Sequence, residues 1–212
     1  NFCSLHLHLF DQSKIPLAKK ALGKNMGVMA ISPADKGGKL YLPSDILKEA
    51  SKPYHPLEIA YRFLLSEGIT TLSLGASKPN DFDLPIKLAN ATQKLSRLEI
   101  NVIANIENES NKRLGVTKCE QCRACLPCPS EVPIPEILRL RNMYIGNGQE
   151  EFAKERYNLI GRAGHWWETK NANNCMSCNF CVPKCPNHLD IPGLLKETHH
   201  LLLDKPKKRL WG

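Results

Sequence analysis

The chain has 212 residues, of which 42% are hydrophobic and 24% are charged, and its formal net charge is +8. These proportions are ordinary for a soluble globular protein, and the length allows one large domain or two modest ones. No apolar run reaches the roughly 18 residues of a membrane helix. Residues 1–10 lack the basic start and the cleavage site of a signal peptide.

The first 95 residues alternate between strand-like and helix-like patterns. Strands are predicted over residues 1–10, 26–31 and 69–74, and helices over residues 14–24, 56–67 and 79–95. Gly68 follows the second of these helices as a stop signal. Strands that alternate with helices predict a parallel sheet with helices outside it.

This α/β part has too few strands for a closed fold. Three βα units cannot close a barrel, and an open parallel sheet exposes an edge. The chain also starts at Asn1, without an initiator Met, inside a strand-like pattern. We therefore expect it to be the C-terminal piece of a longer protein.

Four segments, in this order, resemble the C-terminal part of an aldo/keto reductase. They are MGVMAISP at 26–33, GGKL at 37–40, AYRFLL at 60–65 and GASKP at 75–79. With the cysteine-rich region downstream, the resemblance is to iron–sulfur-containing aldo/keto reductase-like oxidoreductases. It implies that residues 1–96 are the last three βα units of a (β/α)8 TIM barrel. It also implies that the full-length protein is an oxidoreductase that exchanges a hydride between NADP(H) and a small-molecule carbonyl or related substrate.

The resemblance also suggests where NADP(H) would bind. In such barrels the loops after strands 7 and 8 commonly hold a phosphate, and residues 26–31 and 69–74 would be these strands. The resulting candidates are Ser32, Gly37, Gly38, Ser77 and Lys78. The two glycines let backbone N–H groups approach an anion, and the Ser-Lys pair precedes a helix start. Ordinary turns are the alternative. The family's catalytic tetrad belongs to earlier strands, so no catalytic residue is assigned and the fragment alone is expected to be inactive.

Eight of the nine cysteines lie in two short runs, each of which ends in Cys-Pro. The first run, at 119–129, is C-x2-C-x2-C-x2-C-P, and the second, at 175–186, is C-x2-C-x2-C-x3-C-P. The second spacing is that of bacterial ferredoxins. The predicted ligands of two [4Fe–4S] clusters are Cys119, Cys122, Cys125, Cys128, Cys175, Cys178, Cys181 and Cys185.

The runs leave the distribution of ligands between the clusters open. In a two-cluster ferredoxin the fourth Cys of each run reaches the other cluster, which would exchange Cys128 and Cys185. The first run is one residue shorter before Cys128, so each run could instead hold its own cluster. A pair of zinc sites is a further alternative. Soft thiolates that hold iron–sulfur clusters favour a reducing, cytoplasmic compartment.

Residues 97–212 are predicted to form a mostly helical ferredoxin-type domain. A helical connector over 96–118 leads to the first run, and helices over 135–144 and 150–160 separate the runs. Both runs continue through a turn into Ile-Pro and an apolar helix, which indicates an internal repeat. The long spacer is similar to that of α-helical ferredoxins in multi-subunit redox enzymes.

The clusters would exchange electrons with a redox partner protein or hold the domain in shape. A non-catalytic electron carrier or structural iron–sulfur protein with a remnant barrel is the competing function. Nucleic acid is not an expected partner, because only residues 205–209 (KPKKR) are concentrated in basic charge.

Overall fold

The computed structural model describes residues 1–34, 39–162 and 168–204. The chain divides into two compact units, Asn1–Glu107 and Asn108–Gly212. The division falls inside helix α5 (Arg97–Leu114). The candidate phosphate-binding residues Gly37 and Gly38, and the basic tail at 205–209, lie outside the described residues.

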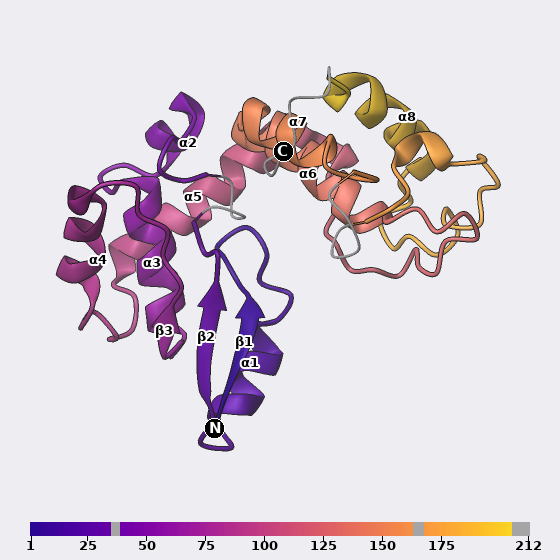
Figure 1. Ribbon diagram of the computed structural model, residues 1–212. Coiled ribbons are helices and arrows are strands. Elements are labelled where there is room, and N and C mark those ends of the chain that lie inside the picture. Colours follow the sequence, from indigo (N-terminus) through magenta and orange to yellow (C-terminus); the bar gives the residue numbers. More distant parts are fainter. Residues whose placement is uncertain (35–38, 163–167, 205–212) are drawn as a thin grey trace. The chain divides into compact units, whose positions relative to one another are not determined.

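The first unit contains a parallel sheet of three strands, as predicted. The strands are β1 (Phe2–His6), β2 (Gly27–Ile31) and β3 (Thr71–Leu72), and they lie in the order β1-β2-β3 (Figure 1). Phe2 pairs with Gly27, and Met29 pairs with Thr71. Because all strands run the same way, their carboxyl ends share one edge of the sheet. Among the described residues the sheet has three strands, too few to close a barrel. The (β/α)8 barrel of the full-length protein is therefore still a prediction.

The helices of the first unit are α1 (Ile15–Leu22), α2 (Asp45–Ala50), α3 (Pro56–Ser66) and α4 (Asp83–Leu88). The helix α3 begins after His55, whose Nδ1 accepts a hydrogen bond from the Leu57 N–H at 3.1 Å. It ends before Gly68, whose φ of 84° belongs to the left-handed region that Gly tolerates.

The helix predicted over 79–95 is shorter in the structure. A 3-10 turn, η1 (Pro79–Phe82), leads into α4, which ends at Leu88. The buried Arg62 guanidinium donates hydrogen bonds to the carbonyls of Ala91 and Gln93. These carbonyls therefore serve a tertiary contact instead of a helix, which periodicity along the sequence does not reveal.

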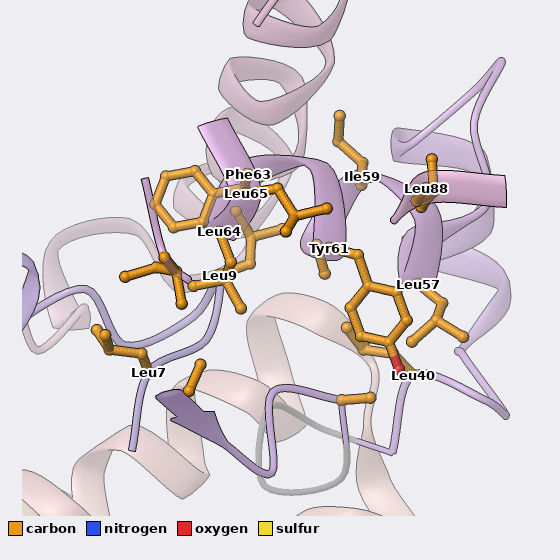
Figure 2. Packing of buried hydrophobic residues seen from close by; sticks show 14 of the residues in the cluster. Leu7, Leu9, Leu40, Leu57, Ile59, Tyr61, Phe63, Leu64, Leu65 and Leu88 are labelled. Carbon is orange, nitrogen blue, oxygen red and sulfur yellow. The ribbon is translucent and has the colours of Figure 1, made fainter. Parts of the chain in front are cut away.

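The core of the first unit surrounds α3. Figure 2 shows the α3 side chains Ile59, Tyr61 and Leu64 with Leu7 and Leu40 from other segments, and all five are at most 1% exposed. Burying side chains of this size stabilises the fold by about 1.5–3 kcal/mol each. The α5 residues Val102 and Ile106 belong to the same core, so this part of the connector is integral to the first unit.

The second unit is built from helices around the cysteine runs. Its helices are α6 (Ile134–Asn147), α7 (Glu150–Tyr157) and α8 (Ile191–Leu202), with 3-10 turns η2 (Gly115–Thr117) and η3 (Ala172–Asn174). The helix α6 packs against both α7 and α8. Ile134, Ile137 and Ile191 are almost fully buried. A mostly helical domain around the cysteines is thus as predicted.

A close approach of two helices occurs at Gly146 of α6. A Cβ atom added there would lie 2.9 Å from a methyl group of Leu114 in α5, and closer still to the Ser110 hydroxyl. A larger residue at this position would require the Ser110 and Leu114 side chains to shift. The part of the chain that the structure describes has no helix long and apolar enough to cross a membrane.

Candidate metal centre

The two cysteine runs occupy equivalent places in two similar halves of the second unit. Each run follows a 3-10 turn, η2 or η3, and leads into a helix, α6 or α8 (Figure 1). The turn after the fourth Cys is the same in both halves. The Glu131 N–H donates to the Cys128 carbonyl at 2.9 Å, and the His188 N–H donates to the Cys185 carbonyl at 3.0 Å. The internal repeat predicted from the sequence is therefore also a structural one.

Left-handed backbone conformations recur at matching positions of the two runs. Such conformations are uncommon for residues other than glycine. The matching pairs are Gln121 with Ser177, Arg123 with Asn179, and Glu131 with His188, all with φ between 51° and 65°. Backbone of this kind turns successive N–H groups toward one point, a concavity that binds anions and is found at many iron–sulfur sites.

Cysteines from the two runs lie near one another. Cys119 is close enough to Cys122 and to Cys185 for thiolate charge on either to act on it. Cys181 is in the same way close to Cys175, Cys178 and Cys128. Cys185 therefore lies near the first cysteine of the first run, and Cys128 lies near the third cysteine of the second run. Cys125 interacts with both Cys119 and Cys181, so the two groups of thiols are neighbours.

A pocket opens at the second of these groups. Its walls include all four cysteines of this group, together with apolar side chains, one hydroxyl and one amide. The lining residues are Cys128, Pro129, Ser130, Ile134, Cys175, Met176, Cys178, Asn179, Phe180, Cys181, Pro192 and Leu195. Within the described ranges, no group of three His, Cys, Asp or Glu side chains could hold a single metal ion. A cluster is larger than an ion and separates its thiolates further.

The first three cysteines of each run show the same order of burial, whereas the fourth is half-buried in the first run and buried in the second. Cys122 and Cys178, the second cysteines, are exposed, whereas Cys125 and Cys181, the third, are buried. Burial, followed by charge on neighbouring thiols, raises the pKa of Cys125 to about 11. Burial also raises the pKa of Cys119 and of Cys181. Because only thiolates bind iron, occupation of the site must expel these protons.

A buried asparagine from α6 holds the start of the first run. The Asn142 side chain donates from Nδ2 to the Cys119 carbonyl at 2.8 Å, and its Oδ1 accepts from the Cys119 N–H at 3.4 Å. Asn142 is 8% exposed. This pair of hydrogen bonds sets the position of the first cysteine relative to the helix that follows the run.

A buried arginine connects the same helix to the other half of the unit. Arg141 is 4% exposed and donates from Nη2 to Glu197 Oε2 of α8 at 3.2 Å. Its Nη1 donates to the Thr117 carbonyl in η2 at 3.4 Å. The Arg141 side chain therefore connects α6 to α8, through Glu197, and to the turn before Cys119.

The second run has a different support. The Tyr157 hydroxyl lies 2.6 Å from His199 Nδ1, and it accepts a hydrogen bond from the Ala172 N–H at 3.3 Å. Burial raises the pKa of Tyr157 to about 12. Burial, with charge on His200, lowers the pKa of His199. A neutral imidazole nitrogen can accept a hydrogen bond from the Tyr157 hydroxyl, and this contact joins α7, α8 and the turn η3 before Cys175.

The described candidates for NADP(H) contact lie after the strands, in the first unit. Ser32 directly follows β2 with a left-handed φ of 51°. The Ser77 N–H and hydroxyl donate to Asp81 Oδ2 at 2.8 and 3.0 Å, and the Lys78 N–H donates to the same oxygen at 3.1 Å. These backbone N–H groups therefore already serve a carboxylate of this chain, which a phosphate would have to displace.

Several supporting residues have no signal in the sequence. Asn142 is 23 residues from the cysteine that it holds, and Tyr157 is 42 residues from His199. Nothing in their local patterns distinguishes them from other helix residues. The repeated left-handed positions have only a weak signal in the sequence. They fall at equivalent positions when the two cysteine runs are aligned.

Residues 118–190 match the family model described as a 4Fe-4S dicluster domain. The match includes both cysteine runs and the two helices between them. No curated protein and no solved structure is similar enough to this chain to count as a match. The iron–sulfur character of the second unit thus rests on the family match and on its cysteines.

Proposed function

We propose that the second unit holds two [4Fe–4S] clusters and passes single electrons through them. The observation that supports this most directly is the interleaving of the runs, which puts Cys185 beside Cys119 and Cys128 beside Cys181. The family match over residues 118–190 gives the same chemistry. Electron transfer needs clusters near each other, and the electrostatic interaction between Cys125 and Cys181 puts one thiol of each set within that range.

The ligand sets follow from the same neighbours. One cluster would be held by Cys119, Cys122, Cys125 and Cys185, and the other by Cys175, Cys178, Cys181 and Cys128. This is the exchanged arrangement of two-cluster ferredoxins. The first run has one residue fewer before its fourth Cys than the second run. Cys128 nevertheless lines the pocket with Cys175, Cys178 and Cys181, so the shorter run does not prevent the exchange.

The surroundings of the cysteines suit an anionic cluster. The left-handed residues of each run, such as Gln121 and Ser177, have the backbone conformation that in general directs N–H groups into an anion-binding concavity. The exposed Cys122 and Cys178 are at the solvent side of each set, where an electron can reach a partner protein. The buried Cys125 and Cys181, one from each set, interact electrostatically with each other.

Iron and sulfide analysis tests this proposal against the zinc alternative. Anaerobically purified or reconstituted chain should contain about eight iron and eight acid-labile sulfide per molecule, as two cubane clusters require. Reduced protein should show an EPR signal of two interacting [4Fe–4S]⁺ centres. Zinc without sulfide would overturn the proposal.

Substitution of Cys178 separates an electron-transferring role from a structural one. The Cys178→Ala variant removes an exposed ligand and is expected to abolish reduction of an external electron acceptor. The helical circular dichroism should stay that of the unsubstituted chain. A variant that still reduces the acceptor at the original rate would support a purely structural role.

We further propose that this chain is the C-terminal portion of an aldo/keto reductase-like oxidoreductase linked to NADP(H). The support is the order of the sequence motifs together with a parallel sheet that carries Ser32 at the carboxyl end of β2. The competing proposal is an electron carrier with a remnant barrel. Anaerobic NADPH oxidation by the full-length protein, with and without Lys78→Ala, distinguishes them, because a carrier oxidises no NADPH.

A further inference from the structure

An unpartnered hydroxyl lies in the cysteine-lined pocket. Ser130 lines the pocket with Cys128, Cys175, Cys178 and Cys181, and its Oγ is buried with no hydrogen-bond partner among the described residues. A buried hydroxyl without a partner costs free energy comparable to a lost hydrogen bond. Such a group therefore indicates an acceptor that belongs in the pocket.

The position of Ser130 is set by the turn after the fourth Cys. It is two residues after Cys128, inside the turn that the Glu131 N–H closes on the Cys128 carbonyl. Glu131 adopts a left-handed φ of 57°. The rest of the pocket lining consists of the four cysteines, the amide of Asn179 and apolar side chains such as Ile134 and Phe180. None of these groups forms a hydrogen bond with the Ser130 hydroxyl.

The other half of the unit has no hydroxyl at the equivalent position. The equivalent residue, two positions after Cys185, is Asn187, and it is exposed. Asn187 therefore has solvent as its partner, whereas Ser130 does not. The two repeats are alike in backbone but differ at this side chain, so they would treat their clusters differently.

We propose that the Ser130 hydroxyl donates a hydrogen bond to a sulfur of the cluster held by Cys128, Cys175, Cys178 and Cys181, and so raises the reduction potential of that cluster alone. This inference rests on the proposed function. The reduced cluster carries one more negative charge than the oxidised cluster, so a donor to its sulfur stabilises the reduced form more. Hydrogen bonds to sulfur are among the determinants of cluster potential.

A redox titration of the full chain, followed by EPR, tests the inference. The Ser130→Ala variant removes only the hydroxyl. We expect about a threefold to tenfold fall in the reduced-to-oxidised ratio of one cluster at fixed potential, where tenfold corresponds to about 59 mV for one electron. The other cluster should be unchanged. Asn187→Ala, at the equivalent exposed position, should leave both clusters unchanged.

Each outcome of the titration decides the question. Unchanged potentials in a fully loaded Ser130→Ala chain would overturn the inference, as would equal shifts of both clusters. If Ser130→Ala loses iron, Ser130→Thr decides: retention of iron and potential supports the hydroxyl, and loss of iron in both variants means that packing alone matters. A wild-type chain without iron and sulfide would refute the proposed function itself, a result distinct from all of these.

Discussion

Replacement of Asn142 by alanine is expected to loosen the first cysteine of the first run. The variant removes the hydrogen bond from Asn142 Nδ2 to the Cys119 carbonyl and the longer one from the Cys119 N–H. The shorter bond, at 2.8 Å, has ordinary geometry, whereas the 3.4 Å contact is at the limit of a hydrogen bond and contributes less. Because Asn142 is buried, water does not readily replace either bond.

The Asn142→Ala variant should lose about 2 kcal/mol of the free energy that keeps the turn at Cys119 closed. This is the sum of one good buried hydrogen bond and one weak one, with the partners that they leave unsatisfied. That corresponds to roughly a thirtyfold larger population of the opened turn at Cys119. Release of iron to a chelator proceeds through such local openings. The loss of the visible cluster absorbance under excess chelator should therefore be about thirtyfold faster, in one of two kinetic phases.

Two further variants make this test specific. Asn142→Asp keeps an acceptor for the Cys119 N–H but replaces the donor by a negative charge, so iron release should be at least as fast as in Asn142→Ala. Asn111→Ala, at an exposed position of α5, should behave as wild type. A release rate for Asn142→Ala within about twofold of wild type would refute the positioning role. Such a ratio corresponds to a free-energy difference of only about a few tenths of a kcal/mol, less than one buried hydrogen bond.

Three other expectations follow from the packing and the charges. Gly146→Ala should destabilise the second unit by about 1–3 kcal/mol in urea unfolding, because the added methyl group overlaps α5, whereas Gly75→Ala, with open space around it, should have little effect. Glu99→Ala should cost the first unit about 3–5 kcal/mol, because it leaves the Arg62 guanidinium buried without its carboxylate at 2.6 Å. The lowered pKa of His199 means that the unfolded chain binds more protons as the pH falls below about 6.5, so stability should drop there.

Each of these expectations has a measurement that can contradict it. Equal urea midpoints for the Gly146→Ala chain and wild type would mean that α5 and α6 do not approach as described. A Glu99→Ala chain as stable as wild type would mean that water reaches Arg62. For His199, the comparison is His199→Gln between pH 7.5 and 5.5. The variant should lose part of the wild-type pH dependence, and parallel curves would contradict the assignment.

Local sequence patterns predicted the parallel order of the strands and the helical character of the second unit. Period-two and helical spacing report on which faces are buried, and the parallel sheet follows from strands alternating with helices. The end of α4 at Leu88 was missed, because the carbonyls of Ala91 and Gln93 bind a guanidinium 29 and 31 residues away. The helix α2 was missed because it is only six residues long.

The cysteine spacing by itself predicted iron–sulfur chemistry in the second unit, which the family match over residues 118–190 supports. Thiolates three residues apart on tight turns converge on one point, and the Cys-Pro endings marked the repeat. Only the tertiary structure decided which cysteines of the two runs are neighbours, since that depends on how the two halves pack. It also showed that the Ser130 hydroxyl is buried while Asn187 is exposed. Burial is a property of the packed chain, and two equivalent positions of a repeat can differ in it without any difference in cysteine spacing.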